Sequence, residues 1–278
     1  MTKTLYGTAL VLMLAGAASP VLAQSASDWS GPYIGVFGGL TQPDDADDET
    51  LLFDRNLDGA FGETVTTSAG ANAFSPGFCS GAPNSPAAAD GCEEDDDGSK
   101  FGARLGYDWQ SGPWVFGVVG EVSFTDAEDR VTGFSTTPAS YTFNRSLEHV
   151  AALRGRIGWG GDRALFYVTG GPAFGKLENG FTTSNTLNSF TTTSDDDKAD
   201  GYQLGGGIEF ALSPRLSLTG EYLHTSLDTE DHVIRVERGA AMATNPFVLA
   251  PNTSGTDMIR SSDSFEFNAI RIGLNLRF

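Results

Sequence analysis

Apolar and polar residues alternate along the C-terminal segment of this chain, residues 267–278. Ile270, Ile272, Leu274, Leu276 and Phe278 fall on one face, and Ala269, Arg271, Gly273, Asn275 and Arg277 fall on the other. Successive side chains of a β-strand point to opposite faces, so this pattern predicts a strand with one apolar and one polar face. A strand of this kind fits either a soluble sandwich or a membrane barrel.

Seven earlier segments show a similar alternation, which is weakest in the first of them. They are residues 33–40, 100–109, 114–124, 148–159, 164–176, 202–210 and 216–222. In the second segment, Phe101, Ala103, Leu105, Tyr107 and Trp109 alternate with Lys100, Gly102, Arg104, Gly106 and Asp108. Together with the C-terminal segment, they predict eight antiparallel strands.

The connections between these segments alternate in length. Tight turns with Gly, Pro, Ser or Asp lie at 111–113, 160–163 and 213–215, and long polar stretches lie at 41–99, 125–147, 177–199 and 226–265. Short turns at one end and long loops at the other are typical of outer-membrane barrels. We therefore predict an all-β fold, a transmembrane antiparallel eight-stranded up-and-down β-barrel with four long extracellular loops. A soluble β-sandwich is the alternative.

The tryptophans favour the barrel. Threading the strands up and down places Trp29, Trp109, Trp114 and Trp159, which are all the tryptophans of the chain, near the periplasmic end. Tryptophan prefers the membrane interface, where its ring is partly buried and its N–H group meets water. A soluble sandwich gives no reason for tryptophans to gather at one edge.

The N-terminal residues 1–23 have the features of a secretory signal peptide. Lys3 supplies the positive charge, residues 5–18 form the apolar stretch, and Val21-Leu22-Ala23 places small residues at a cleavage position. A transmembrane anchor is the alternative, but the apolar run is short for a span of about 20 residues. The expected organisation is a signal peptide at 1–23 and an outer-membrane barrel at 24–278, which locates the protein in the cell outer membrane.

The charge balance limits the partners. The chain has 36 acidic and 17 basic residues, a formal net charge of −19. Nucleic acid is therefore excluded as an expected partner, because phosphate binding needs a basic surface. Cys79 and Cys92 are the only cysteines. An exported protein meets oxidising conditions, so we expect them to form a disulfide rather than a metal site.

Three short motifs lie at matching places in a known family. They are Asp28-Trp29-Ser30-Gly31-Pro32-Tyr33-Ile34-Gly35, Gly220-Glu221-Tyr222 and Arg271-Ile272-Gly273-Leu274-Asn275-Leu276-Arg277-Phe278. Through the order and positions of these motifs, the chain resembles the outer-membrane immunogenic proteins of Gram-negative alphaproteobacteria. That family is part of the wider opacity and OmpA-like set of eight-stranded barrels. The resemblance implies an abundant surface-exposed barrel with a structural, small-porin or adhesive role. It implies no catalytic residue.

Alternation also places charged residues inside the barrel. The expected lumen network comprises Arg104, Glu121, Arg154, Arg156, Glu209, Glu221 and Arg271. The same alternation places Lys100, Asp108, Glu148 and Arg277 on the inward face. An eight-stranded barrel is just wide enough for side chains to fill. The charges would then pair as a polar core. The alternative is a narrow pore gated by these groups.

The first long loop carries two acidic runs. Asp44, Asp45, Asp47, Asp48 and Glu49 form the first run, and Glu93, Glu94, Asp95, Asp96 and Asp97 form the second. Carboxylate clusters can bind Ca²⁺, but the position that would carry the bidentate Glu of a calcium loop is Arg104. We expect these runs to form a solvated, mobile loop at the surface. We predict no metal site and no cofactor.

One constellation suggests hydrolysis. His224, Ser226 and Glu266 share one parity at the expected extracellular rim, and could supply base, nucleophile and orienting acid. The His-x-Ser pattern resembles outer-membrane lipid A deacylases, although Leu227 stands where that family is expected to carry Asn.

The sequence thus favours a non-enzymatic outer-membrane barrel with a structural or surface-exposed role. Weak porin activity is left open. An adhesin or ligand-binding protein acting through its loops is one alternative, and a lipid A hydrolase is the other. The expected partners are outer-membrane lipid, lipopolysaccharide and, through the terminal Phe278, the barrel-assembly machinery. The sequence does not determine the oligomeric state.

Overall fold

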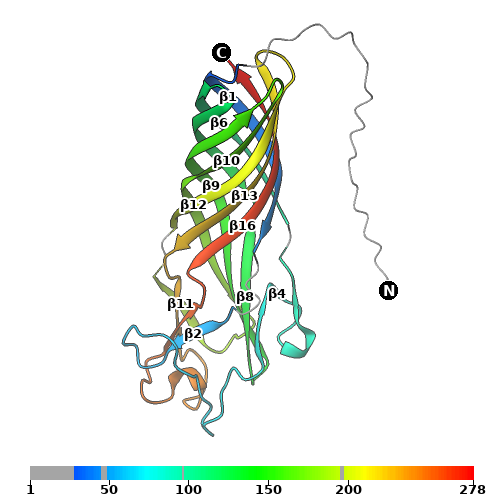
Figure 1. The fold of residues 1–278 in the computed structure, drawn as a ribbon. Helices are drawn as coiled ribbons and strands as arrows, with labels where there is room; N and C mark the ends of the chain where they lie inside the picture. Colours follow the sequence, from blue (N-terminus) through cyan, green and yellow to red (C-terminus); the bar gives the residue numbers. More distant parts are fainter. Residues whose placement is uncertain (1–27, 45–48, 96, 195–196) are drawn as a thin grey trace, which may run out of the picture.

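Eight long strands close into a barrel in the computed structural model, which describes residues 28–44, 49–95, 97–194 and 197–278 (Figure 1). The strands are β1 (Gly31–Pro43), β6 (Gly98–Ser111), β7 (Trp114–Thr125), β9 (Ala139–Gly160), β10 (Ala164–Thr183), β12 (Lys198–Ala211), β13 (Leu216–Thr229) and β16 (Ser264–Arg277). Each pairs antiparallel with the next, and β1 pairs with both β6 and β16. The predicted eight-stranded antiparallel barrel is confirmed.

The outer face of the barrel is apolar. The exposed side chains along β16 are Ile270, Ile272, Leu274 and Leu276, and equivalent rows include Phe101 and Leu105 on β6 and Leu153 and Ile157 on β9. Along β6 and β16, more and less buried residues alternate as the period of two requires. A closed sheet has no free edge and can therefore present this apolar surface to hydrocarbon.

Glycines on the inner face make room for aromatic rings. A side-chain carbon at Gly102 would lie 2.6 Å from the ring of Phe37, and one at Gly106 would lie 2.4 Å from the ring of Tyr33. Both rings come from β1 and are buried inside the barrel. The alternation of glycine with charged residues on β6 therefore reflects close approach between neighbouring inner side chains.

Three tight connections define one end of the barrel, which we call the turn end. β6 and β7 are joined through Gly112, β9 and β10 through 161–163, and β12 and β13 through 212–215. Trp109, Trp114 and Trp159 are about half exposed on the outer face near these turns. This position agrees with the expected interfacial belt.

Trp29 is at the same end but does not join that belt. Its side chain is 2% exposed and packs inside against Val115, Leu165 and Tyr167. Its Nε1 donates a hydrogen bond of 3.3 Å to the carbonyl of Gly161. The expectation of four interfacial tryptophans was therefore wrong for Trp29, because the segment before β1 packs inside the barrel.

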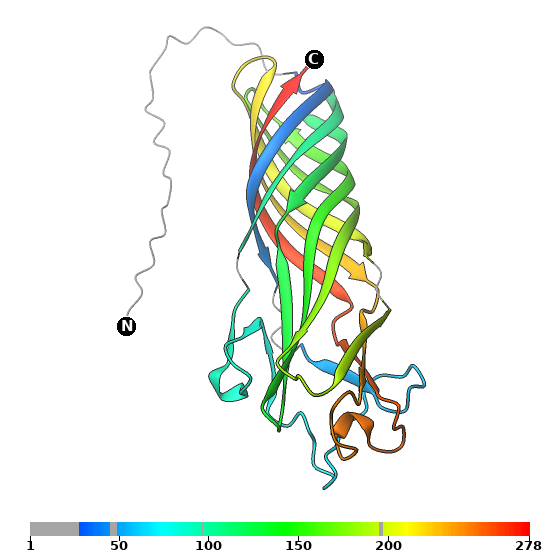
Figure 2. The ribbon, with the colours of Figure 1, turned by 180° about the vertical axis from the view of Figure 1, so that it is seen from behind.

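At the opposite end, the long connections form a folded cap (Figure 2). β8 (Glu128–Ser135) pairs with the first half of β9 and with β3 (Gly77–Ser80). A second sheet contains β11 (Ser189–Ser194), β14 (Val233–Glu237), β15 (Thr256–Arg260) and β2 (Leu51–Asp54). One apolar core lies inside the cap. It includes Phe53, Phe74, Phe143, Val236 and Met258, which come from different connections. The stretches expected as polar loops thus hold an apolar core of their own.

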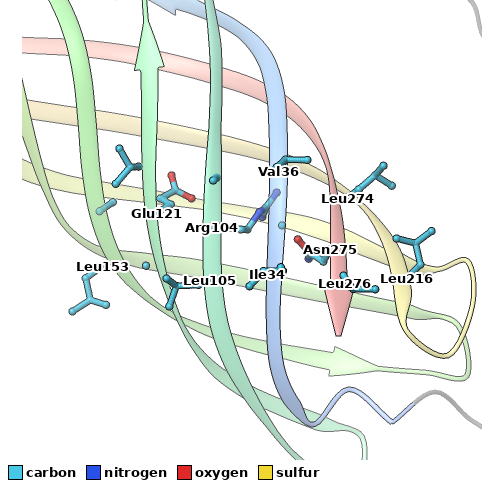
Figure 3. Close-up of a pocket in the computed structure, with 15 residues that line it drawn as sticks. Ile34, Val36, Arg104, Leu105, Glu121, Leu153, Leu216, Leu274, Asn275 and Leu276 are labelled. Atoms are coloured by element: carbon cyan, nitrogen blue, oxygen red, sulfur yellow. The ribbon is translucent and has the colours of Figure 1, made fainter. Parts of the chain in front are cut away.

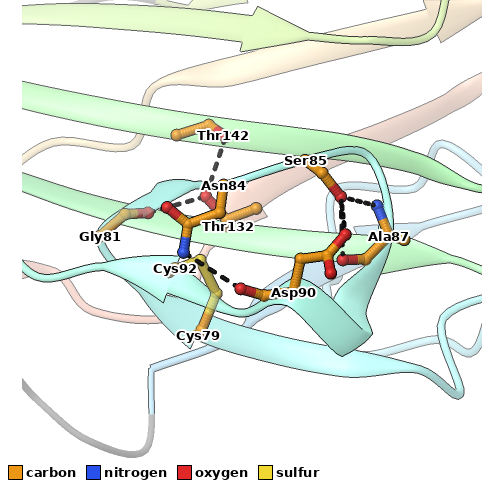
Figure 4. Close-up of a disulfide and its surroundings, with 9 residues drawn as sticks. All are labelled: Cys79, Gly81, Asn84, Ser85, Ala87, Asp90, Cys92, Thr132 and Thr142. Atoms are coloured by element: carbon orange, nitrogen blue, oxygen red, sulfur yellow. Dashed lines mark hydrogen bonds between the residues drawn. A yellow bond between two sulfur atoms is a disulfide. The ribbon is translucent and has the colours of Figure 1, made fainter. Parts of the chain in front are cut away.

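The disulfide lies on one side of this cap. Cys79 of β3 is bonded to Cys92 of β5 (Cys92–Glu93), and β5 pairs with β4 (Ala82–Pro83) (Figure 4). Thr132 of β8 donates a hydrogen bond of 2.8 Å to the carbonyl of Gly81. The disulfide therefore closes a small segment that is already anchored to the β8–β9 hairpin.

Helices contribute little to the described structure. Two single 3-10 turns occur, η1 (Ala88–Asp90) and η2 (Pro246–Val248), both in the cap. Within the ranges given above, no helix has the length and hydrophobicity needed to cross a membrane. The expected signal peptide at 1–23 lies outside the described residues.

Candidate functional site

Five charged side chains from five strands meet in the lumen, and we call them the central cluster. Arg271 donates two hydrogen bonds of 2.7 Å to the carboxylate of Glu121. Arg154 donates to the same carboxylate at 2.6 Å. Arg104 donates to Glu221 at 2.6 Å, and Arg271 Nε donates to it at 3.0 Å. None of the five side chains is more than 2% exposed, so each charge is neutralised by its neighbours rather than by water.

A second group, the turn-end cluster, lies between the central cluster and Trp29. Arg156 donates hydrogen bonds of 2.7 Å to Asp108 and 2.9 Å to Glu209. Arg277 donates to Asp108 at 2.9 Å and also to the carbonyl of Trp29. The last contact joins the charge network directly to the residue that packs inside the turn end. All seven residues of the expected lumen network thus lie in one of these two clusters.

Aromatic rings lie beside the arginines of both clusters. The guanidinium of Arg271 is 4.1 Å from the ring centroid of Phe37, and that of Arg156 is 4.9 Å from Tyr33 and 5.0 Å from Tyr167. Such cation–π contacts are favourable where water is excluded. The expected lumen network did not include these rings. The spacing of Tyr33 and Phe37, four residues apart among glycines on the same face of the strand, is the signal that could have identified them.

An apolar layer covers the central cluster on the cap side. It includes Leu147, Leu177, Leu227, Phe265 and Phe267, all at most 1% exposed. Lys100 lies beneath it, with Nζ 4.9 Å from the ring centroid of Phe267. Within the described part of the chain, this Nζ has no hydrogen-bond partner. The Lys100 amino group is therefore held against an aromatic face rather than against a carboxylate.

Glu148 departs from its expected place in the lumen. Its side chain is 44% exposed and forms an ion pair of 2.9 Å with Lys176. The β9–β10 pairing shifts register here, since Lys176 pairs with His149 and Leu177 with Leu147. The extra residue exchanges the inward and outward faces of β9 at this point, so simple alternation predicts the wrong face for Glu148.

A hollow of about 840 Å³ interrupts the apolar outer face (Figure 3). Its lining includes the outward-facing Ile34, Leu105 and Leu153. Ala103 and Gly120 also line it, and a side-chain carbon at Gly120 would meet no atom within 4 Å. The hollow therefore results from small residues between large ones on the surface that faces hydrocarbon. The inner-face residues Arg104, Glu121 and Asn275 also belong to its lining.

A third charged group ties the cap to the barrel rim. Arg260 donates hydrogen bonds of 2.6 and 2.5 Å to Glu49 and of 2.7 Å to Asp129, and Arg145 donates to Asp129 at 2.7 Å. Burial by itself would raise the pKa of Asp129, but Arg260 and Arg145 together lower it below its usual value of 3.8. We call these four residues the rim cluster. They link the first, second and fourth long connections.

The acidic runs of the first connection are therefore not wholly solvated. Glu49 is buried in the rim cluster, and Asp95 forms an ion pair of 2.7 Å with Arg130. Residues 45–48 and 96 lie outside the described residues. Among the residues that are described, no group of three or more His, Cys, Asp or Glu side chains is arranged to hold a metal ion.

The three residues considered for hydrolysis are near one another but are not arranged as a triad. Ser226 donates a hydrogen bond of 3.1 Å directly to Glu266. His224 instead contacts Asn268, with 3.2 Å between Nδ1 and Oδ1. Among the hydrogen bonds of the described residues, none joins His224 to Ser226. This geometry lacks the nucleophile–base contact that the chemistry requires.

Known proteins show similarity over most of the chain. Residues 8–278 match the family model of the outer membrane protein β-barrel domain. Over 182 residues, the chain is 30% identical to the 31 kDa outer-membrane immunogenic protein of Brucella melitensis. The match covers 64% of this chain and 65% of that protein, which is less than two thirds of the relative's length.

A second curated relative and a solved structure show further similarity. The 22 kDa outer membrane protein of Rhizobium leguminosarum bv. viciae is 27% identical over 135 residues, or 48% of this chain and 55% of that protein. The crystal structure of the outer membrane protein OprG from Pseudomonas aeruginosa has a TM-score of 0.46 and 13% identity. It covers 92% of this chain and 99% of that one.

Proposed function

Because the chain belongs to the outer membrane protein β-barrel domain family, we propose that it is a non-conducting surface barrel that supports a folded extracellular cap. The resemblance to outer-membrane immunogenic proteins is confirmed, and the chain is a protein of the cell outer membrane. In the proposed orientation, the turn end faces the periplasm and the cap faces the exterior.

One observation carries this proposal, namely the order of layers along the lumen. Trp29 with Val115 and Leu165 closes the turn end, the two charge clusters follow, and the apolar layer around Phe267 comes next. An ion that crosses the barrel would have to displace both apolar layers and separate buried ion pairs. Breaking one such pair costs about 3–5 kcal/mol. A filled interior therefore favours a support over a pore.

Single-channel recording tests the proposal. The mature chain is refolded in detergent, its heat-modifiable migration confirms the folded barrel, and it is reconstituted in a planar bilayer. We expect no discrete conductance steps, because two apolar layers and two charge clusters fill the lumen. Reproducible steps would overturn the proposal and favour a small porin, and a known porin in the same bilayers controls for sensitivity. Neutralising Arg154 or Glu121 would then show whether the central cluster is the gate.

A second candidate, binding through the cap, is favoured by the organisation of the long connections. All four contribute side chains to one apolar core, so the cap presents a defined surface rather than four independent loops. Excising residues 44–97 is therefore a poor test of binding, because it removes Phe53 and Phe74 from that core. Point substitutions on the cap surface are the suitable test.

The expected partners fit the same proposal. The apolar outer face suits lipid and the acyl chains of lipopolysaccharide. Phe278 is 69% exposed at the turn end, where it could be recognised by the barrel-assembly machinery. In a reconstituted assembly reaction, Phe278→Ala should slow folding, whereas Leu212→Ala in a neighbouring turn should not. Equal rates for the two variants would exclude a role for the Phe278 ring.

A further inference from the structure

Within the cap, all four long connections meet around a cavity of about 190 Å³. Ala73 and Phe74 come from the first connection, residues 135–139 from the second, 184–187 from the third and 245–247 from the fourth. The cavity is separate from the lumen and from the rim cluster, with which it shares no lining residue. Its small volume fits a single ring-sized group, since drug-sized ligands occupy roughly 300–1,000 Å³.

The cavity has a rigid apolar floor. Phe74, Tyr141 and Phe247 pack against one another with ring centroids 5.3–5.9 Å apart, and each is at most 3% exposed. Burial raises the pKa of Tyr141, so its phenol is neutral. Pro138 and Pro246 add further apolar surface to the lining. A ligand here therefore needs at least one apolar face.

The rim of the cavity carries hydroxyl groups that are available to a ligand. Thr136, Thr137 and Thr186 line it and are exposed. Among the hydrogen bonds of the described residues, none uses the hydroxyl of any of these three threonines. A hydroxyl can both donate and accept, so the rim suits a ligand with hydroxyl groups of its own.

The lining contains no charge. None of its residues is Asp, Glu, Lys, Arg or His, although charged residues make up 19% of the chain. An anionic or cationic ligand would lose hydration here without gaining a counter-charge. A purely apolar ligand would leave the hydroxyl rim unused. The remaining class is a neutral molecule with one apolar face and several hydroxyls, which is the chemistry of an uncharged sugar ring.

The walls of the cavity are fixed before any ligand arrives. Thr136 N donates a hydrogen bond of 2.7 Å to the carbonyl of Ala73, which joins the second connection to the first. Asn185 Nδ2 donates to the hydroxyl of Tyr141 at 2.9 Å, which joins the third to the second. Asn245 Nδ2 donates to Asn188 at 3.0 Å, which joins the fourth to the third. A prebuilt site avoids the cost of ordering loops on binding.

We infer that this cavity binds one uncharged sugar residue, either a free neutral monosaccharide or the terminal residue of a glycan. The inference rests on the proposed function, because it assigns a ligand class to the cap that the barrel supports. The threonine hydroxyls bond the sugar hydroxyls, and the apolar floor covers the C–H face of the ring.

Saturation-transfer NMR on the full folded barrel tests this inference, in a zwitterionic detergent without a sugar head group. The probes are neutral monosaccharides, neutral oligosaccharides, and acidic sugars of similar size. We expect saturation transfer to neutral sugars. The variant Thr136→Val/Thr186→Val should weaken binding about tenfold through loss of two hydrogen bonds. Thr244→Val, exposed on the fourth connection and absent from the cavity lining, should bind as the parent protein does.

Each outcome decides the inference. Transfer to monosaccharides supports it and identifies a free sugar as sufficient, whereas transfer to oligosaccharides alone supports it and identifies a glycan. Absence of transfer to every neutral probe, transfer to acidic sugars alone, or equal transfer in the double variant would overturn it. If the double variant does not fold, Thr186→Val serves in its place. A silent bilayer with no sugar binding would overturn only this inference, while conductance steps would overturn only the non-conducting barrel.

Discussion

Arg154 Nη2 lies 2.6 Å from Glu121 Oε2 in the lumen, and neither side chain is more than 1% exposed. The two residues stand on the neighbouring strands β7 and β9. Glu121 also accepts hydrogen bonds from both Nη atoms of Arg271, which lies on the more distant strand β16. The pair therefore belongs to a network in which each charge depends on several strands.

Removing one member of this network should destabilise the barrel. Arg154→Met keeps most of the side-chain volume but leaves Glu121 and Glu221 with fewer partners in a buried site. We expect a loss of about 3–5 kcal/mol in the free energy of unfolding, measured by urea denaturation in detergent. The double variant Arg154→Met/Glu121→Leu should recover part of this loss, because no carboxylate is then left unpaired at that position.

The exposed Arg215, in the turn between β12 and β13, provides the control. Arg215→Met should leave the free energy of unfolding within about 0.5 kcal/mol of the parent value. If Arg154→Met proves as harmless as Arg215→Met, the central cluster does not stabilise the barrel.

Trp29 and Trp109 should report different surroundings, although both lie near the turn end. Trp29 is 2% exposed inside the barrel, whereas Trp109 is 53% exposed on the outer face. In variants that keep a single tryptophan and replace the others with Phe, acyl chains brominated close to the head group should quench Trp109 strongly and Trp29 weakly. Quenching requires close approach, and the barrel wall separates Trp29 from the lipid. Equal quenching of both would place Trp29 in the interfacial belt after all.

The cap should loosen in acid through Asp129. Its folded pKa is below the unfolded value, because Arg260 and Arg145 outweigh the opposing effect of burial. Such a group contributes stability that is complete above an unfolded pKa of about 3.9 and is lost as the pH falls through the folded pKa. Hydrogen exchange of the cap backbone should therefore accelerate as the pH is lowered from about 5 towards 2, after correction for intrinsic exchange rates.

The variant Asp129→Asn tests the assignment, because it removes the titrating group while preserving its shape. Its cap should exchange faster at neutral pH and show a smaller acid response. Asp263→Asn, at an exposed position nearby, should retain the full response of the parent protein. An unchanged acid response in Asp129→Asn would assign the effect to other carboxylates.

The disulfide should stabilise its own segment rather than the barrel. Cys79 and Cys92 are separated by 13 positions, and a cross-link of this span contributes about 3 kcal/mol. In Cys79→Ser/Cys92→Ser, proteolysis between these positions should be faster while heat-modifiable migration is retained. Loss of the folded barrel in this variant would show that the segment is needed for assembly.

Sequence alternation predicted the barrel because each strand separates two different surroundings. Hydrocarbon outside and a polar, confined lumen inside impose opposite requirements on successive residues. Parity thus assigned Arg104, Glu121 and Arg271 to the interior without knowledge of their partners. Glu148 was assigned to the wrong face, because one extra residue shifts the register there and exchanges the inner and outer faces.

What the sequence alone could not determine depends on contacts between residues far apart in the chain. Neither the burial of Trp29 beneath Arg277 nor the contact of Arg271 with Phe37 leaves a periodic signal. The cap core and its uncharged cavity likewise combine side chains from four separate connections. The sequence by itself thus determined the barrel, its polar inner face and its apolar outer face, because local alternation suffices for these. Only the tertiary structure decided which charges pair, what closes the lumen and where the cap could bind a ligand, because packing across strands sets all three.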